Sequence, residues 1–572
     1  MKKTRLLVIA LALVMFFSAC APGAAPAAPA APGAATDPAG TAPGGAEAVA
    51  GGGLLTLEQS GGIVLPIVDE PITLTVFWEA DPKAMAVIPS YHDMRIFHEM
   101  ERFTNISLDF MHPPAGQTEQ QFSLMLATNS LPDLVWFNWT RVPGGVMDLL
   151  GEGTLLRLND FLDAGYLPNM ARLFDERPIN RKQGTLPDGT FFSFPKIRND
   201  GRTVVTTGLQ IRYDWMQSVG ITQVPETIAE WEVLLTAFRD NRGNGVIPVD
   251  SFPFGGRSDN PNLIPIDAFS NAWYLIYNDF AMRDNGTRVI YGPLLPEYRD
   301  FVETMRRWYA EGLLDPDYLA TDNASFEAKI INGHLGAYHG TVNGNMGRFK
   351  DIRRDAGDYT FDLIPLPNAI SHLPEAGGRR FGRHVQSYMS ADGMAITNNN
   401  RFPLESAIFL DLFYSPELII KTNYGIEGES FIWEEGNDFP TFTDIVMNHP
   451  TEPLINAIHI YNFAISQGPM IQLTEMFLQT AHHTRMQEAY VEWTRDTTQI
   501  NLFNLVPFDE EGAILARIMS EARTLTEERV NRMIMGVDSM DAFDDYVQLL
   551  RDMGVEEAVA IMQGMLDRFN AG

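Results

Sequence analysis

A two-residue alternation of apolar and polar side chains predicts the first strand of the chain. Residues 72–78 read ITLTVFW, which places Ile, Leu, Val and Trp on one face and two threonines on the other. Helical spacing follows at 94–103 and 121–127, and strand patterns recur at 106–111 and 131–140. Because strands and helices alternate, we predict an α/β lobe with a largely parallel sheet.

The strand pattern at 131–140, LPDLVWFNWT, ends in a cluster of aromatic and polar residues. Trp136, Asn138 and Trp139 lie together there, and Trp78 ends the first strand pattern in a similar way. These side chains either pack in the core or enter a cleft. Since ligands of open α/β sheets bind at the carboxyl ends of strands, the shared placement favours the cleft.

Helical patterns are more frequent after residue 200. Thr227 and Glu230 have the spacing of a capping box, and the apolar stripe from Trp231 to Phe238 follows at helical intervals. We assign this stripe and Trp308 to the core. Two further apolar stripes within 543–569, separated by a glycine, predict a helical C-terminal region.

The N-terminus has the features of a secretory signal. Basic residues precede an apolar segment at 6–17, which is shorter than the roughly 20 residues that span a bilayer. Cys20 follows this segment after Ser18 and Ala19 and is the only cysteine, so no internal disulfide can form. The arrangement resembles the lipobox of bacterial lipoproteins, with Phe17 where leucine is usual. Residues 1–20 are therefore expected to be the signal, and 21–69, rich in Ala, Pro and Gly, a tether.

Size and charge narrow the function further. A chain of 572 residues is too long for one ordinary core, so two or more domains are expected. The net charge of −31 argues against a nucleic-acid surface, because phosphates would be repelled. No HExxH, GxSxG or P-loop motif occurs in the sequence. A glycosidase needs two carboxylates across a cleft, and among 73 acidic residues no pair stands out.

Four segments carry a resemblance to a known family. They are IRYDWMQSVGITQVPETIAEWEVLLTAF at 211–238, WYAEGLLDPDY at 308–318, YGIEGESFIW at 424–433, and IMGVDSMDAFDDYVQLLRDMGVEEAVAIMQGMLDRF at 534–569. Together they resemble family 1 of the bacterial extracellular solute-binding proteins, the lipoproteins that bind substrates for ABC importers. The similarity is greatest to the branch assigned to aldouronates and other oligosaccharides.

This resemblance implies a two-lobed α/β fold of the periplasmic-binding-protein type II, with the ligand cleft between the lobes. We expect lobe one to comprise 70–200 and 358–418, and lobe two to comprise 201–357 and 419–572. The chain would then cross between the lobes near 200, 357 and 418.

The resemblance also implies a function without catalysis. We expect a monomer, lipid-anchored through Cys20 on the extracytoplasmic face of the cell membrane. It would capture an oligosaccharide, uronate-containing sugars included, and deliver it to the transmembrane subunits of an ABC permease. Two alternatives stay open: a lipoprotein of the same fold that binds peptides or other solutes, and a secreted glycoside hydrolase.

Sugar recognition requires flat aromatic faces together with planar hydrogen-bonding groups. Arg198 could also pair with a uronate through two hydrogen bonds, whereas Arg212 is expected to form a structural pair with Asp214. For each aromatic candidate the alternative is core packing, and we expect Trp139→Ala to weaken binding with little loss of stability. The expected ligand-binding residues are Trp78, Asn138, Trp139, Arg198, Trp273, Tyr274, Tyr388 and Trp433.

One loop invites comparison with a calcium site. Asp240–Gly245 reads DNRGNG, and some members of the resembling family have a calcium-like loop at this place. Here the later acidic positions are missing and Arg242 adds a positive charge, whereas calcium needs six or more oxygen ligands. We therefore expect a surface turn and neither a metal nor another cofactor.

Overall fold

The computed structural model describes residues 54–571, apart from 115, 143–144, 261–262, 384–386, 482–483 and 503–504. Cys20, the expected lipid attachment site, lies outside the described residues. Within the described part of the chain, no helix combines the length and apolarity that a membrane crossing requires.

The first sheet has six strands in the order β15-β4-β12-β3-β1-β2. β1 pairs in parallel with β2 and β3, and β15 pairs in parallel with β4, whereas β12 runs antiparallel to both β3 and β4. The strands are β1 (Ile72–Phe77), β2 (Ile106–Met111), β3 (Leu134–Asn138), β4 (Ser193–Arg198), β12 (Met389–Ile396) and β15 (Met470–Gln472).

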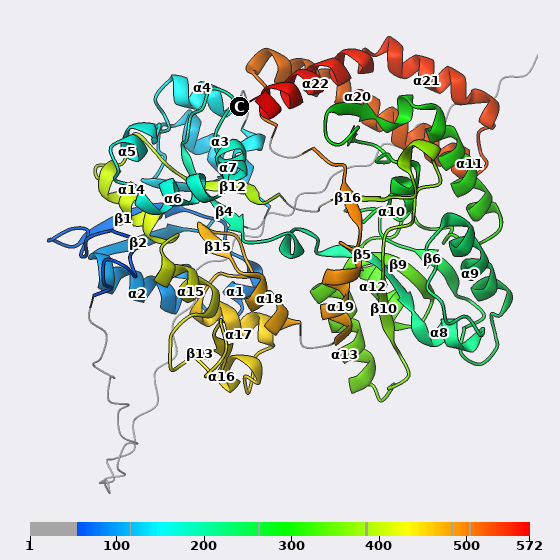
Figure 1. The fold of residues 1–572 in the computed structure, drawn as a ribbon, viewed down its shortest axis with the longest axis horizontal. Helices are drawn as coiled ribbons and strands as arrows, with labels where there is room; N and C mark the ends of the chain where they lie inside the picture. Colours follow the sequence, from blue (N-terminus) through cyan, green and yellow to red (C-terminus); the bar gives the residue numbers. More distant parts are fainter. Residues whose placement is uncertain are drawn as a thin grey trace, which may run out of the picture. The chain divides into compact units, whose positions relative to one another are not determined.

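Helices surround this sheet (Figure 1). They contribute buried side chains to two hydrophobic clusters. A two-stranded ribbon, β13 (Phe431–Ile432) with β14 (Thr441–Phe442), adds to one of them. The helices are α1 (Pro82–Met85), α2 (Arg95–Thr104), α3 (Thr118–Ala127), α4 (Val146–Gly151), α5 (Asn159–Asp163), α6 (Pro168–Glu176), α7 (Pro178–Gly184), α14 (Pro403–Leu412), α15 (Pro416–Tyr424), α16 (Asp444–Met447), α17 (Leu454–Tyr461) and α18 (Thr474–Thr480).

The second sheet has four strands in the order β10-β5-β9-β6. β5 runs antiparallel to both neighbours, and β6 is parallel to β9. Two ribbons accompany it, β7 with β8 and β11 with β16. The strands are β5 (Thr207–Arg212), β6 (Phe252–Gly255), β7 (Phe280–Arg283), β8 (Arg288–Tyr291), β9 (Leu335–Thr341), β10 (Leu363–Leu366), β11 (Arg380–Gly382) and β16 (Thr497–Gln499).

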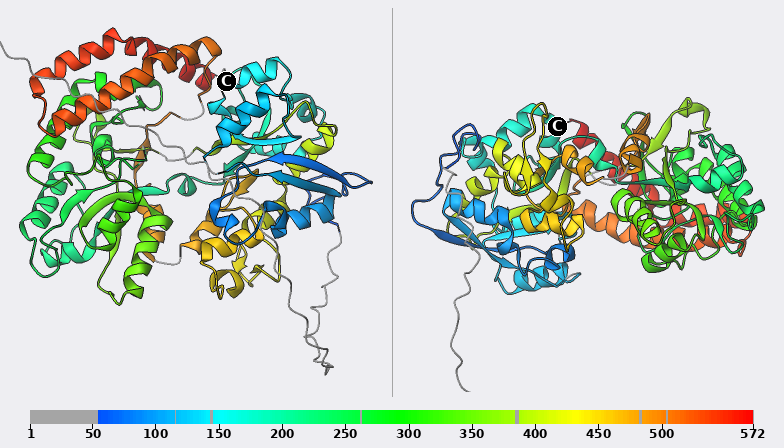
Figure 2. Two further views of the ribbon diagram at one scale, coloured as in Figure 1. Left: turned by 180° about the vertical axis from the view of Figure 1, so that it is seen from behind. Right: turned by 90° about the horizontal axis from the view of Figure 1, so that it is seen from below.

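The helices of this second region form a core with the buried face of its sheet. The last three helices pack side by side, as Figure 2 also shows. The helices are α8 (Tyr213–Ser218), α9 (Ile228–Asp240), α10 (Asp267–Ser270), α11 (Pro296–Ala310), α12 (Asn323–Ile331), α13 (Arg348–Asp355), α19 (Thr484–Glu492), α20 (Asp509–Ile534), α21 (Phe543–Asp552) and α22 (Val555–Ala571).

The elements predicted from local patterns are confirmed. β1, α2, β2, α3 and β3 follow in the expected order, and their pairing is parallel throughout. The Thr227 hydroxyl oxygen accepts a hydrogen bond from the Glu230 N–H, and the Glu230 carboxylate accepts one from the Thr227 N–H, so the capping box exists. Trp231 and Trp308 are fully buried, as predicted.

The observed connections between the two sheets differ from the predicted lobe boundaries. Residues 358–382 were expected in lobe one, yet β10 pairs with β5 and Phe381 packs in the core of the second sheet. Residues 419–480 were expected in lobe two, yet β15 extends the first sheet beside β4. Along the chain, β4 of the first sheet is followed by β5 of the second, β11 of the second region by β12 of the first sheet, and α18 of the first region by α19 of the second. Long-range strand pairing, which local patterns do not report, sets these positions.

The expected tether also differs from the structure at its end. Residues 54–70 pack on the first region, where Ile63 is buried and Ser60 donates a hydrogen bond to its carbonyl. Asn169 donates from its side chain to the Ser60 carbonyl at 3.2 Å. The Ala/Pro/Gly composition ends before residue 54, and the apolar residues after it have a surface to bury.

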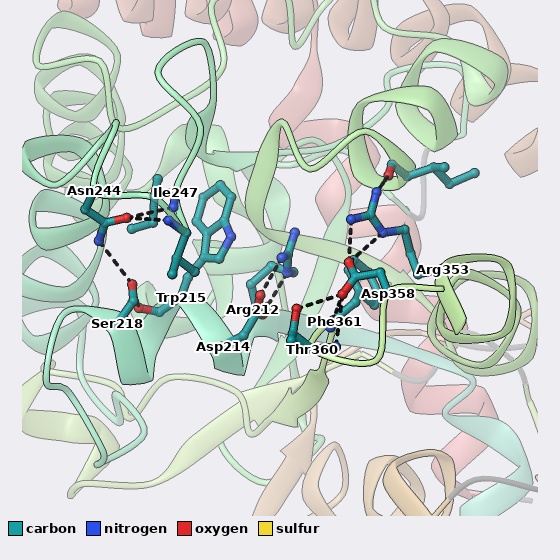
Figure 3. Close-up of polar contacts among 12 residues, drawn as sticks. Arg212, Asp214, Trp215, Ser218, Asn244, Ile247, Arg353, Asp358, Thr360 and Phe361 are labelled. Atoms are coloured by element: carbon teal, nitrogen blue, oxygen red, sulfur yellow. Dashed lines mark hydrogen bonds and ion pairs between the residues drawn. The ribbon is translucent and has the colours of Figure 1, made fainter. Parts of the chain in front are cut away.

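Arg212 is buried at the end of β5 and forms the structural ion pair that was predicted (Figure 3). Its Nε donates to Asp214 at 2.8 Å, and a second nitrogen of the guanidinium donates to the other carboxylate oxygen. The guanidinium lies over the ring of Phe361 at 4.5 Å. Arg212 ends β5 and Asp214 lies in the first turn of α8, so the Arg212–Asp214 ion pair fastens the start of α8 to the sheet.

Asp358 fastens the turn that leads into β10 (Figure 3). One carboxylate oxygen accepts hydrogen bonds from the Thr360 N–H at 2.9 Å and hydroxyl at 2.7 Å, and the other pairs with Arg353. Burial alone would raise the pKa of Asp358, but the hydrogen bonds from Thr360 and Arg353 outweigh it and hold this pKa well below its usual range. The charged form is therefore the one that stabilises the fold.

Replacing Asp358 by Asn should lower the free energy of unfolding by about 1–2 kcal/mol at pH 7, because a charge-assisted pair is lost. The folded-state pKa lies well below the unfolded value of about 3.9, so this contribution is complete above that value, begins to decrease below it, and is lost only as the pH falls through the folded-state pKa. Thermal unfolding of D358N and the parent at pH 7 and pH 3 checks this.

Asp355→Asn is the matched control, since that carboxylate is 72% exposed and its ion pair with Arg354 should contribute little. A D358N deficit that is as large at pH 3 as at pH 7 contradicts the prediction.

Candidate functional site

The carboxyl ends of β1 and β3 border a cavity of about 440 Å³, here called the strand-end pocket. This is the edge of the sheet at which parallel α/β folds bind ligands. Polar side chains from five separate segments converge on it. Its lining residues are Glu79, Ala80, Asp81, Pro82, Thr118, Glu119, Trp136, Phe137, Asn138, Arg141, Asp392, Ile465, Ser466 and Gln467.

Asn138 and Asp392 form a cross-strand pair in this pocket. They lie directly opposite each other in the antiparallel register of β3 and β12. Side chains of opposed residues share one face of a sheet, with Cβ atoms roughly 5 Å apart. The register therefore presents a planar amide and a carboxylate side by side. Their separation suits two neighbouring groups on one small ligand.

Both members of the pair are held by local hydrogen bonds that leave capacity for a ligand. The Asn138 side-chain oxygen accepts from the Thr140 N–H at 3.2 Å and hydroxyl at 2.6 Å. Asp392 accepts from the Ser390 hydroxyl at 3.0 Å through one of its oxygens. Among the described residues, none accepts from the Asn138 amide nitrogen or donates to the second Asp392 oxygen.

Trp136 supplies the aromatic wall of the pocket. It stands two residues before Asn138 and so shares its face of β3. Its ring stacks on Trp78 with centroids 5.5 Å apart and an interplanar angle of 26°. Trp78 lies behind it, 1% exposed, between Tyr91, Phe97 and Phe463.

Glu79 and Asp81 continue the wall just beyond β1. Glu79 accepts hydrogen bonds from the Gly116 N–H at 3.1 Å and from the Thr118 hydroxyl. Asp81 caps α1 and accepts from the Ser466 hydroxyl at 2.9 Å. Ser466 is in turn 2.6 Å from Nε2 of the fully buried His459, and burial lowers the pKa of that imidazole.

Two cations of β4 are buried close to Asp392 and are not part of the pocket lining. Lys196 donates to the Ser466 carbonyl at 2.5 Å, and Arg198 donates to the Ser387 carbonyl at 2.8 Å. Burial lowers the pKa of Arg198 to about 10, with the Asp392 charge acting in the opposite direction. Burial, followed by the Arg198 charge, also holds the pKa of Lys196 well below its usual range.

Two of the eight residues expected to bind ligand, Asn138 and Trp139, line cavities. Asn138 lines the strand-end pocket, and Trp139 lines a separate, mostly apolar cavity of about 150 Å³ with Phe192, Leu505 and Val506. The structure does not bring the eight together. Tyr388 is half-buried beside the first crossing, and Trp433 is 47% exposed after β13.

Trp273 and Tyr274 belong to the core of the second region. Trp273 is 1% exposed and donates its indole N–H to Asp300 at 2.7 Å. Tyr274 stacks on Phe381 with ring centroids 3.6 Å apart, while the Arg283 guanidinium lies 4.8 Å from its ring centroid. Their surroundings fit the core-packing alternative that the sequence left open.

Sequence reasoning missed Asp392, Glu79, Gln467 and the pocket-facing role of Trp136. Asp392 carried a signal, because it interrupts the apolar pattern of a strand beside a glycine. Glu79 carried another, since it directly follows the strand-ending Trp78. Gln467 lies in a loop without a distinctive pattern, and only the fold brings it to this edge.

The Asp240–Gly245 loop is a surface turn closed by its own side chains. Asp240 pairs with Arg239 at 2.7 Å, and Asn244 accepts hydrogen bonds from the N–H groups of Val246 and Ile247. Across the described residues, no cluster of three or more His, Cys, Asp or Glu side chains is arranged to hold a metal ion.

No protein-family model matches the chain. Among known proteins, the fructooligosaccharide ABC transporter substrate-binding protein FusA of Streptococcus pneumoniae is 24% identical over 350 residues, 58% of this chain and 60% of FusA. Lipoprotein LipO of Bacillus subtilis is 22% identical over 471 residues, 80% of this chain and 86% of LipO. The chain thus aligns with less than two thirds of FusA.

A solved structure of the alginate-binding protein AlgQ2 without calcium superposes with a TM-score of 0.67 at 24% identity, over 88% of this chain and 99% of AlgQ2. The fold is that of the two-lobed solute-binding proteins. The likeness extends across both sheets, and the strand-end pocket belongs to the first of them.

Replacing Trp139 by Ala should cost about 3–5 kcal/mol of stability, the usual range for truncating a buried tryptophan. Its indole N–H donates to the Gly393 carbonyl at 2.9 Å, and its ring contacts Phe122, Phe137 and Phe192. This burial reverses the sequence-based expectation of little stability loss. Differential scanning calorimetry of the purified variant gives the measurement.

Trp433→Ala is the matched control, because it makes the same substitution at an exposed position. Removal of this exposed ring should leave the free energy of unfolding within about 0.5 kcal/mol of the parent. A Trp139→Ala protein as stable as Trp433→Ala would contradict this assignment and favour a ligand-contacting ring.

Proposed function

We propose that this protein is the substrate-binding component of an ABC importer and captures an oligosaccharide at the strand-end pocket. The observation that carries the proposal is the Asn138–Asp392 pair beside Trp136, at the ligand-binding edge of a solute-binding-protein fold. The names of FusA, an ABC transporter substrate-binding protein for fructooligosaccharides, and of AlgQ2, an alginate-binding protein, support a carbohydrate ligand.

The chemistry of the pocket suits sugars. A pyranose or furanose ring offers adjacent hydroxyl groups that both donate and accept hydrogen bonds. The amide of Asn138 supplies a donor, and the carboxylate of Asp392 supplies an acceptor. Trp136 supplies apolar ring area, and Gln467 and Arg141 supply further hydrogen-bonding groups. Together they match an edge of hydroxyls and a face of C–H groups.

The mechanism we propose is capture and delivery without catalysis. The ligand binds to the first region, the second region closes on it by hinge motion at the crossing segments, and the closed form docks on a membrane permease. The signal-like N-terminus and Cys20 support lipid anchoring on the extracytoplasmic face, and the name of LipO, a lipoprotein, is consistent with this. A monomer suffices for this cycle.

The purified protein should bind at least one oligosaccharide from a panel of fructo-, xylo-, manno- and galacto-oligomers with one-to-one stoichiometry. Isothermal titration calorimetry measures the affinity, and chromatography of the recovered ligand should show it intact. Asp392→Ala removes an acceptor of the proposed pair and should weaken binding at least tenfold, in line with the energy of a hydrogen bond to a charged group.

Asp544→Ala is the matched control, because this carboxylate of α21 is 87% exposed and distant in sequence from the pocket. Its affinity should equal that of the parent. Cleavage of the ligand would identify a glycoside hydrolase instead, and binding of peptides alone would identify the other alternative on this fold.

A further inference from the structure

We infer that the strand-end pocket selects sugar units without negative charge and rejects uronates, with Asp392 and Glu79 as the specificity-determining residues. The inference rests on the proposed function, because it concerns the ligand of the same pocket. It also narrows the sequence-based expectation, which included uronate-containing sugars.

The lining of the pocket is strongly acidic. Four carboxylate side chains face it, Glu79, Asp81, Glu119 and Asp392, and Arg141 is the single lysine or arginine in the lining. Arg141 is already paired with Glu119 at 2.8 Å, so it neutralises one of the four. Glu79 forms no ion pair with any described residue, and its two hydrogen bonds come from uncharged donors.

The cations behind the lining do not reverse this balance. Arg198 and Lys196 act on Asp392 from β4, but both are buried and neither lines the pocket. Lys196 Nζ donates to the Ser466 carbonyl and one Arg198 nitrogen donates to the Ser387 carbonyl, so the backbone already engages one nitrogen of each cation. His459 lies 3.9 Å from Asp81, and burial favours its neutral form.

A uronate carboxylate placed here would meet acceptors and like charges. Like charges about 6–8 Å apart at the effective permittivity of a protein surface repel by an energy that corresponds to roughly a tenfold loss of affinity or more. A neutral sugar hydroxyl in the same place donates to Asp392 and accepts from the Asn138 amide, so both members of the pair are satisfied. The pair is therefore complementary to hydroxyls and repels carboxylates.

The test compares uronate-containing sugars with neutral sugars of matched length. Oligogalacturonate, oligomannuronate and glucuronate-bearing xylo-oligomers are each paired with the neutral oligomer of the same length, and the affinities are measured calorimetrically for the full chain. We expect the neutral member of the recognised pair to bind at least tenfold more tightly. Asp392→Asn and Glu79→Gln remove charge at nearly constant shape and should each reduce this ratio several-fold.

Asp544→Asn is the control variant, and its ratio should equal that of the parent. A uronate that binds as tightly as its neutral partner overturns the inference while leaving the proposed function intact. A neutral preference that Asp392→Asn and Glu79→Gln leave unchanged overturns the assignment to these two residues. If no sugar of any pair binds, the proposed function and the inference both fail.

Discussion

The antiparallel pairing of β12 with β3 is the interaction on which the candidate site depends. β12 reaches this position from far along the chain, and the contact between Trp139 and the Gly393 carbonyl joins residues 254 apart in sequence. The pairing register sets Asp392 opposite Asn138. A shift by one residue would turn Asp392 to the other face of the sheet and separate the pair.

Two buried charged side chains accompany the Asn138–Asp392 pair, and their burial carries a desolvation cost. Lys196 and Arg198 lie on the neighbouring strand, almost fully buried, and each donates to a backbone carbonyl and is influenced by the charge of Asp392. Removing a charged group from water is unfavourable unless hydrogen bonds and opposite charges replace the solvent. Because these buried side chains lie close to Asp392, the groups at the pocket are held before any ligand arrives, which reduces the entropy lost on binding.

Local patterns reported the elements well, because each depends on neighbours in sequence. The alternation at 72–78 gave a strand, and Thr227 with Glu230 gave a capped helix, since both signals lie within one turn or a few strand residues. The lobe boundaries depend on pairing between strands that are distant in sequence. β10 and β15 look like ordinary short strands, and their partners, β5 and β4, lie on different sheets. No local feature of either segment states which sheet it joins.

The same division holds for the site. The local pattern is enough to place Asn138 at the end of a strand and three tryptophans near two strand ends, because these are facts of position along the chain. Which indole faces the pocket follows from the packing of distant segments: Trp78, Trp136 and Trp139 are all nearly buried, and of these three Trp136 alone lines the strand-end pocket. Only the tertiary structure decided that Asp392 is the partner of Asn138, since strand register is set by packing between distant segments rather than by composition.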